Sequence, residues 1–250
     1  MEKAPERPLP AAVPHFTVYQ DFVAEYDLLR SKMDREGNLL KEVGKIVPVD
    51  GADIVELAAG TGKLTFLLAP RARSIRAFDG MGPMLDFATA KADRSGFGNV
   101  SFALADNRAI PLPDACAEIV LEGWSIGYLV SQTGEGWEKE VDKVLNEMER
   151  LLRPGGTLLI VGTLGTGAHH PKPPNAELAM LYDYLTGEKG FTQCPWFKTD
   201  YAFDSAKQAE QLIRFFWSDR FGDFIRDRQM QIVPECTTIW YKRKKAGDGK

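Results

Sequence analysis

Short apolar segments alternate with amphipathic segments over residues 53–165, and this alternation constrains the fold more than any other feature. Strands are expected at 53–57, 74–79, 99–106, 117–124 and 157–165. Most of the segments between them have the helical spacing of apolar residues. Strands joined by helices of this length form a parallel sheet with helices on both faces. The sequence therefore predicts an α/β fold.

The segments before and after this alternation are expected to form a lid on the same domain. Their residue spacing predicts helices at 18–33, 37–47, 176–187 and 205–229, and strands at 196–203 and 231–244. Pro234 is expected near an edge or bulge of the last strand. The predicted boundaries are a flexible lead-in at 1–16, lid helices at 17–47, a cofactor-binding core at 50–163, a substrate or lid region at 164–229, a final strand at 230–243 and a flexible tail at 244–250. We expect residues 17–243 to be one domain.

Charge and cysteine content limit the class of protein. The formal net charge of the 250 residues is −4, which argues against a large electrostatic interface with nucleic acid. No apolar run approaches the ~20 residues of a membrane span, and the N-terminus lacks the apolar core of a signal peptide. Cys116, Cys194 and Cys236 show neither metal-ligand spacing nor a disulfide framework. We therefore expect a cytoplasmic monomer or homodimer with no metal, nucleic-acid or membrane partner.

The stretch "GTGKLT" looks like the end of a phosphate-binding loop, but its spacing excludes that function. Such a loop needs a glycine five residues before Gly62 and a hydroxyl residue directly after Lys63. Leu57 and Leu64 stand at those positions. Lys63 is therefore expected to be an early helix residue that faces solvent.

The two glycines of this stretch still indicate a ligand site. Gly60 and Gly62 let the backbone approach a ligand at the carboxyl end of the first strand. Thr65 stands where a dinucleotide-binding pattern needs its third glycine, which argues against NAD. A glycine turn without any ligand is the alternative that the loop alone leaves open.

Three acids close three successive predicted strands. Glu56 and Asp79 end the first two, and Asp106, followed by Asn107, ends the third. Each alone is more often a helix cap or a solvated turn. An acid about 20 residues after a glycine loop suits ribose hydroxyls. Together they predict a pocket for a cationic nucleoside that carries no polyphosphate.

The chain resembles the class I S-adenosylmethionine-dependent methyltransferases of the small-molecule type (methyltransferase type 11-like). The resemblance rests on "VELAAGTGKLT", "AFDGMGPMLDFA", "ALADNRAIPLPDACAEIVLEGWSIGYL" and "MERLLRPGGTLLIVG", within residues 50–163. The segment "EGWS" departs from the Asp/Asn-Pro-Pro-aromatic form of methylases that act on amino groups of DNA or protein. The resemblance implies a Rossmann-like sheet of seven strands, mostly parallel with the last strand antiparallel, and a helical lid. It also implies methyl transfer from S-adenosylmethionine to a small organic acceptor, O- or N-directed.

The resemblance further implies which residues contact the cofactor. They are Tyr19, Tyr26, Glu56, Ala58, Ala59, Gly60, Thr61, Gly62, Asp79, Gly80, Met81, Asp106, Asn107, Glu122, Gly123 and Trp124. Glu56 would lie beneath the cofactor's amino group, and Asp79 would hold its ribose hydroxyls. Met81 would lie against the adenine. Asp106 would accept a hydrogen bond from the amino group of the adenine. Trp124 would sit near the sulfonium.

The acceptor side is expected at the lid. His169 or His170 is a candidate general base, because both follow the fifth strand; His15 is a further candidate, and Glu235 is expected to be structural. Trp124, Trp196 and Tyr201 are expected to line the acceptor pocket. Phe215, Phe216 and Trp217 are expected to be mostly core. A regulatory or partner protein that binds an S-adenosyl ligand without catalysis is the alternative function.

Overall fold

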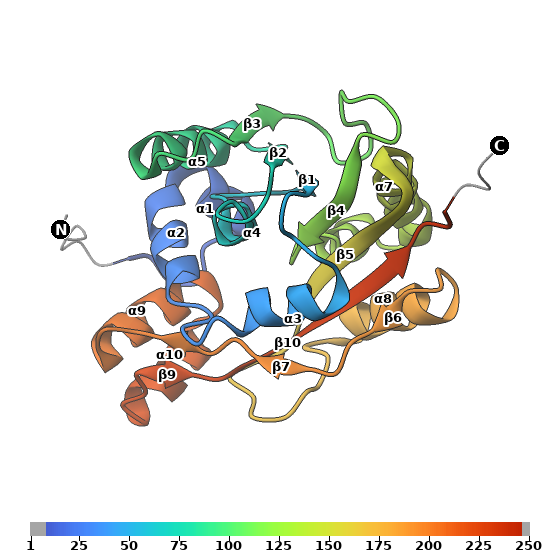
Figure 1. Cartoon of the computed structure of the whole chain (residues 1–250). Coiled ribbons are helices and arrows are strands. Elements are labelled where there is room, and N and C mark those ends of the chain that lie inside the picture. The colour runs from blue at the N-terminus through green and yellow to red at the C-terminus, as the bar shows by residue number, and fades with distance from the viewer. Residues whose placement is uncertain (1–8, 247–250) are drawn as a thin grey trace.

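A mixed, eight-stranded sheet forms the centre of the molecule in the computed structural model, which describes residues 9–246. The order is β3-β2-β1-β4-β5-β10-β6, and β7 also pairs with β10 (Figure 1). The strands are β1 Asp53–Leu57, β2 Ser74–Asp79, β3 Val100–Leu104, β4 Ala117–Gly123, β5 Leu152–Thr166, β6 Thr192–Gln193, β7 Phe197–Lys198 and β10 Glu235–Arg243. Strands β1 to β5 are parallel, and β10 runs antiparallel to β5. The predicted fold class is therefore confirmed, but the sheet has eight strands instead of the predicted seven, because the short strands β6 and β7 both pair with β10.

Ten helices and a second, two-stranded sheet complete the described part of the chain. The helices are α1 His15–Asp21, α2 Val23–Ser31, α3 Asn38–Ile46, α4 Lys63–Leu68, α5 Gly82–Ser95, α6 Gly127–Thr133, α7 Trp137–Leu151, α8 Ala176–Gly187, α9 Ala206–Phe216 and α10 Asp219–Asp227. The small sheet pairs β8 Tyr201–Ala202 with β9 Ile232–Val233.

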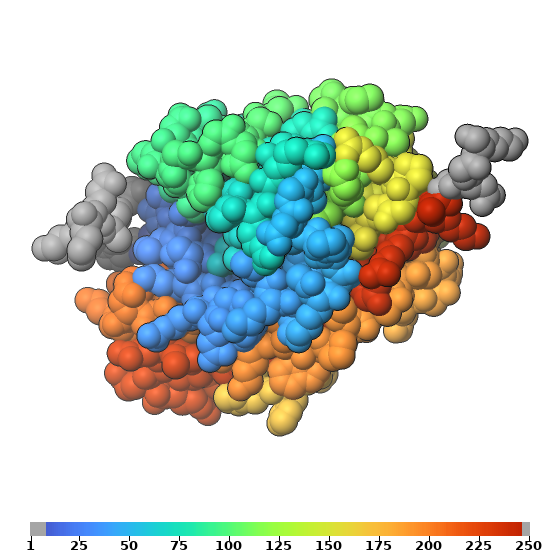
Figure 2. Space-filling view, in the orientation of Figure 1, coloured from blue at the N-terminus to red at the C-terminus, as the bar shows by residue number. Residues whose placement is uncertain are grey.

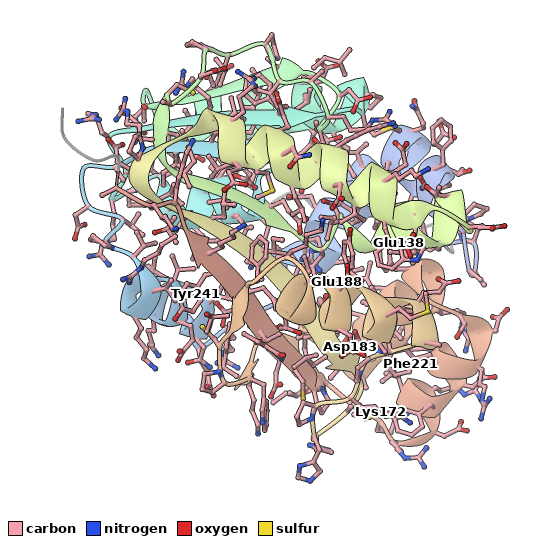
Figure 3. The ribbon with its side chains drawn as sticks, turned by 90° about the vertical axis from the view of Figure 1, so that its right-hand side faces the viewer. Glu138, Lys172, Asp183, Glu188, Phe221 and Tyr241 are labelled. Carbon is pink, nitrogen blue, oxygen red and sulfur yellow. The ribbon has the colours of Figure 1, made fainter. Side chains whose placement is uncertain are left out.

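Helices cover both faces of the central sheet because the strands are apolar on both sides. On one face, α3 and α4 bury Leu39 and Leu64 against β1 and β2. On the other, α7 and α8 bury Met148 and Leu181. Figure 3 shows α7 and α8 side by side. An apolar core on each face thus holds the sheet in place. The carboxyl ends of its strands are left free to face the lid.

The lid joins the first and last parts of the chain. The backbone N–H groups of Ala12 and Val13 donate to the carbonyls of Arg214 and Phe215 at 3.0 and 3.1 Å. These carbonyls lie in the last turn of α9, where a helix leaves its C=O groups unsatisfied. In Figure 2, the blue N-terminal residues and the orange residues after β5 form one continuous surface. This side of the molecule is therefore built from segments far apart in sequence.

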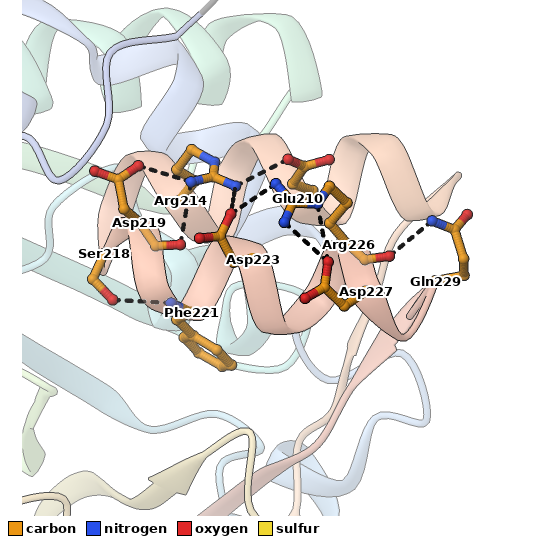
Figure 4. Close-up of polar contacts among 9 residues, drawn as sticks. All are labelled: Glu210, Arg214, Ser218, Asp219, Phe221, Asp223, Arg226, Asp227 and Gln229. Carbon is orange, nitrogen blue, oxygen red and sulfur yellow. Dashed lines mark hydrogen bonds and ion pairs between the residues drawn. The ribbon is translucent and has the colours of Figure 1, made fainter.

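Two helices expected to be continuous are broken. The expected helix at 18–33 is α1 and α2, separated at Phe22, which has φ −130° and ψ 38°. The expected helix at 205–229 is α9 and α10, because the Ser218 hydroxyl accepts from the N–H of Phe221 and starts a new helix. Figure 4 shows Ser218 at this start and Arg214 reaching across to Asp219 and Asp223. The Ser205 hydroxyl caps α9 by accepting from the N–H of Gln208.

Some strand and boundary predictions were also wrong. The expected strand at 196–203 is two short strands, β7 and β8, in different sheets. The expected last strand is split at Pro234 into β9 and β10, and β5 begins five residues before the expected strand at 157–165. Helix α1 begins inside the expected flexible lead-in, and Lys244 bonds to the backbone of Gly156. The rest of the expected tails, residues 1–8 and 247–250, lie outside the described residues.

Candidate functional site

Two cavities meet at the carboxyl edge of the sheet. The larger has a volume of about 980 Å³ and lies over the ends of β1, β2 and β4. The smaller has a volume of about 390 Å³ and lies between β4, β5 and the lid. Both are lined by His15, Tyr19, Tyr26, Trp124, Ser125, Ile126 and Tyr128. The two cavities therefore share a wall, so that two ligands bound there would be neighbours.

The glycine loop forms one wall of the larger cavity with a left-handed backbone. Ala58, Gly60 and Gly62 have φ angles of 51°, 55° and 82°. A Cβ at Gly62 would lie 2.6 Å from the ring of Phe66, so this position needs glycine for space as well as for its φ angle. The N–H of Ala58 donates to Asn107 Oδ1 at 3.2 Å, which ties the loop to the segment after β3.

Asp79 is held in a defined orientation at the centre of this wall. Its Oδ2 accepts from the N–H of Gly60 and its Oδ1 from the N–H of Met81, both at 2.8 Å. Burial raises the pKa of this carboxyl, while the backbone donors oppose the shift. Each carboxylate oxygen keeps a lone pair, so Asp79 can still accept two hydroxyl groups from a ligand.

Most of the predicted cofactor residues line the larger cavity. They are Tyr19, Tyr26, Ala58, Gly60, Asp79, Gly80, Met81, Asp106, Asn107, Gly123 and Trp124. Ala59, Thr61 and Gly62 belong to the same loop but are not among its lining residues. Asp106 is exposed, and its carboxylate pairs with Arg108 at 2.5 Å. The edge of the sheet thus brings Asp79, Asp106 and most of the other residues of this set to one cavity.

Glu56 and Glu122 differ from their predicted positions. Glu56 lines neither cavity; its Oε2 accepts from the Thr65 hydroxyl at 2.5 Å, and burial raises its pKa to about 8. Glu122 lines the smaller cavity instead of the larger one. Its Oε2 accepts from the N–H and hydroxyl of Ser125 and the N–H of Ile126. Its buried Oε1 has no partner in the described chain, and burial raises the pKa to about 7.

Trp124 stands at the junction of the two cavities in a left-handed conformation. Its φ is 57°, which for a bulky residue is strained, and its N–H donates to the carbonyl of Val161. The guanidinium carbon of Arg30 lies 4.3 Å from the centre of the ring. The indole Nε1, which is buried, has no partner within residues 9–246. One face of the ring is therefore already covered by a cation.

The predicted base and acceptor residues are only partly brought to the site. His169 and His170 are exposed and line neither cavity, and Trp196 also lies outside both. The structure thus does not place either of the two expected histidine bases beside one of the cavities. His15 lines both cavities, with its ring centre 4.6 Å from that of Phe216. Tyr201 lines the smaller cavity.

Lys63, Arg30 and Glu235 have surroundings that the sequence did not indicate. Lys63 does not face solvent: its Nζ donates to the carbonyl of Met33 at 2.7 Å, and burial lowers its pKa to about 8. Arg30 and Glu235 line the smaller cavity. The position of Arg30 four residues after Tyr26 was a usable signal, because these residues share a helix face. Within residues 9–246, no group of His, Cys, Asp and Glu could hold a metal, and no helix is long and apolar enough to cross a bilayer.

Comparisons with known proteins agree with this geometry. A family model described as "Methyltransferase domain" matches residues 55–160, which hold the glycine loop, Asp79 and Glu122. The ubiquinone/menaquinone biosynthesis C-methyltransferase of Hahella chejuensis is 28% identical over 66% of this chain. The demethylmenaquinone methyltransferase of Thermus thermophilus is 27% identical over 66% of this chain. The matches cover 63% and 70% of those two relatives, so the chain spans less than two thirds of the Hahella protein.

Solved structures agree on the fold. A SAM-dependent methyltransferase from Aquifex aeolicus aligns with a TM-score of 0.57 at 15% identity, over 88% of this chain and 98% of that one. A putative type II methyltransferase from Anaeromyxobacter dehalogenans aligns with a TM-score of 0.57 at 15% identity, over 84% and 97%. The family model, the relatives and the Asp79 site point to one cofactor, S-adenosylmethionine. In sequence over residues 55–160 and in fold, the chain is similar to the class I S-adenosylmethionine-dependent methyltransferases.

Proposed function

We propose that this protein transfers a methyl group from S-adenosylmethionine, bound in the larger cavity, to a small organic acceptor in the smaller one. The observation that carries the proposal is the shared wall between the two cavities, formed in part by Tyr19, Tyr26 and Trp124. A shared wall is what in-line displacement requires, because most of the catalytic gain comes from holding the two reactants in contact.

The larger cavity fits this cofactor on three counts. The buried carboxylate of Asp79 lines it with both oxygens oriented. The left-handed backbone at Ala58 and Gly60 leaves main chain open to a ligand. The cations in its wall, Arg108 and Lys143, are both paired with acids. When bound, S-adenosylmethionine supplies an activated methyl group on its sulfonium, and the leaving group is a neutral thioether. Asp79 would hold the ribose hydroxyls, and the loop at 58–62 would contact the amino-acid end.

We assign the proton-accepting role to Glu122 in place of His169 and His170. Its Oε2 is fixed by Ser125 and Ile126, and its free Oε1 belongs to the smaller cavity. A pKa of about 7 suits a general base at neutral pH. A hydroxyl, amine or acidic C–H acceptor would give its proton to Glu122 as the new bond to the methyl carbon forms. His15 also lines the cavity, but it stacks on Phe216.

The lining of the smaller cavity favours an acceptor with an apolar, flat body. Phe216, Trp217, Phe221, Leu181 and Tyr182 contribute to it. The names of the Hahella and Thermus relatives refer to methylation at carbon and to menaquinone synthesis. We therefore add carbon to the oxygen and nitrogen acceptor atoms expected from the sequence, and propose an aromatic acceptor.

Thermal unfolding with four ligands tests the cofactor assignment. S-adenosylmethionine and S-adenosylhomocysteine, at about 100 times their dissociation constants, should each stabilise the protein by about 2.7 kcal/mol. For a chain of this size, that corresponds to a Tm rise of roughly 5–11 °C. NAD and ATP should have no effect. A shift with NAD or ATP alone would contradict the proposal.

A matched pair of variants tests the site. Asp79→Ala should lose most of the stabilisation by S-adenosylhomocysteine, whereas Asp86→Ala, an exposed acid on α5, should keep it. Incubation of the wild type with labelled S-adenosylmethionine and a metabolite extract then separates enzyme from non-catalytic binder. Cofactor binding without any labelled product would favour the regulatory alternative.

A further inference from the structure

The smaller cavity holds an unusual concentration of buried polar atoms without partners. Among residues 9–246, the buried side-chain atoms that lack a partner are Arg30 Nε, Thr61 Oγ1, Glu122 Oε1, Trp124 Nε1, Glu235 Oε2 and Trp240 Nε1. All of these residues except Thr61 and Trp240 line the smaller cavity. Buried polar atoms in proteins are nearly always bonded, so this set indicates a bound polar group.

Arg30 is the cation of this set. The residue is 8% exposed, and its Nη1 donates to the Tyr201 hydroxyl at 2.9 Å. Its guanidinium lies over Trp124, and it forms no ion pair within the described chain. Arginine stays protonated in proteins, and a buried charge without a counter-charge is costly. The free Nε of the guanidinium and the free indole Nε1 of Trp124 are both donors at the cavity wall.

Glu235 interacts electrostatically with Arg30 but does not neutralise it fully below neutral pH. Burial raises the pKa of both Glu122 and Glu235 to about 7. Glu235 Oε1 accepts from the Thr163 hydroxyl at 2.5 Å, which leaves Oε2 free. The other titratable residues of this wall are His15 and Tyr19 from α1, Tyr26 from α2, Tyr128 from α6, Tyr182 and the exposed Glu177 from α8, and Tyr201 from β8. Burial lowers the pKa of His15, which favours its neutral form.

We infer that the acceptor is a carboxylic acid whose carboxylate pairs with the guanidinium of Arg30. The planar fork of arginine matches a carboxylate in a bidentate way, and the free Nε is one of the donors that such a pair uses. Glu122 and Glu235 then accept from a hydroxyl or amino group on the same molecule. Such a group is also the one that would be methylated, with its proton passing to Glu122. The inference rests on the proposed function, because it treats the smaller cavity as the acceptor site.

Calorimetric titration with benzene derivatives tests this inference. The wild-type protein is first saturated with S-adenosylhomocysteine, and its affinity is recorded. Benzoate, 4-hydroxybenzoate, benzamide and benzyl alcohol are then titrated at pH 6.5 and pH 8. Benzoate should bind at least about tenfold tighter than benzamide, which has the same shape without the charge. 4-Hydroxybenzoate should bind tighter than benzoate, and the affinity of both acids should fall at pH 8, where Glu122 and Glu235 are ionised.

Three variants locate the effect. Arg30→Met keeps the apolar stem and should abolish the preference for benzoate, with the affinity for S-adenosylhomocysteine changed less than about twofold. Tyr201→Phe removes the hydroxyl that positions Arg30 and should reduce the preference by several-fold, which keeps the test possible if Arg30→Met does not fold. Arg226→Met, on the surface of α10, should behave as the wild type.

The outcomes separate this inference from the proposed function. Absence of S-adenosylhomocysteine binding by the wild type would contradict the proposed function itself. Binding of S-adenosylhomocysteine together with equal affinities for benzoate and benzamide would overturn the carboxylate inference alone. A preference for benzoate that persists in Arg30→Met would overturn it as well.

Discussion

Single residues beside the larger cavity were predictable because their positions depend on local sequence. Gly60, Gly62 and Asp79 lie at the ends of adjacent strands, and parallel strands bring their carboxyl ends to one edge. The acceptor side was not predictable in this way. Glu122 was assigned to the cofactor because the strand end alone does not tell which way its side chain points. Its orientation depends on the turn at Ser125 and Ile126, whose donors hold Oε2.

At the residue scale, the role of Glu122 predicts a pH dependence. Below a pKa of about 7 the carboxyl is protonated and cannot accept a proton, so kcat/KM should fall about tenfold for each pH unit. Glu122→Gln should lower the rate by roughly 10²- to 10⁴-fold and remove this acid limb. The measurement is a pH profile of labelled methyl transfer from pH 5.5 to 8.5.

A surface glutamate is the control for that profile. Glu188, labelled in Figure 3, is exposed at the end of α8. Glu188→Gln should keep both the rate and the acid limb. An acid limb that survives in Glu122→Gln would show that another group, such as His15, takes the proton.

At the scale of elements, the sequence predicted regular helices and strands well. It predicted the interruptions between successive helices poorly. Strands β1, β2 and β4 and helix α8 lie close to their expected ranges, because each has a clear apolar pattern. The α9–α10 break was missed because apolar spacing continues through Phe215, Phe216 and Trp217 into Phe221. The break lies at Ser218, whose hydroxyl caps α10. A serine after an apolar run was the available signal.

The break between α9 and α10 predicts that replacement of Ser218 lowers the free energy of unfolding. Ser218→Ala removes the cap of α10 and should lower the free energy of unfolding by about 1 kcal/mol. Ser95→Ala is the matched control: the Ser95 hydroxyl bonds back to the carbonyl of Lys91 within its own helix, and its loss should be close to neutral. Urea unfolding of both variants provides the comparison. Equal stability of the two would mean that Ser218 does not determine the break.

At the scale of the whole molecule, buried carboxyls make the free protein less stable as pH rises. Burial raises the pKa of Glu56 to about 8 and those of Glu122 and Glu235 to about 7. Between the unfolded value of 4.5 and these values, the folded state holds protons that the unfolded state has released. The free energy of unfolding therefore falls with pH across this window. Above pH 8 the lowered pKa of Lys63 acts in the opposite direction.

Glu56 dominates the upper part of this window, so one variant isolates its effect. Between pH 6.5 and 8, the wild type should lose up to about 2 kcal/mol through Glu56. Glu56→Gln can still accept from Thr65 and should show a smaller loss over the same range. Urea unfolding at three pH values measures both slopes. Parallel slopes would show that Glu56 is not protonated in the folded protein.

The position of β10 also sets the order in which a newly made chain can acquire its site. Strands β6 and β7 precede β10 in sequence but, in the described chain, pair with β10. Glu235 lies on that same strand, whereas Arg30 and Tyr26 were made long before it. A ribosome adds about 5–20 residues per second. The cavities at the carboxyl ends of β1 to β4 therefore lack the wall that β10 supplies for at least several seconds. During that interval Tyr182 of α8 and strand β5 lack the partner that β10 supplies, because Trp240 of β10 stacks on Tyr182 in the folded chain.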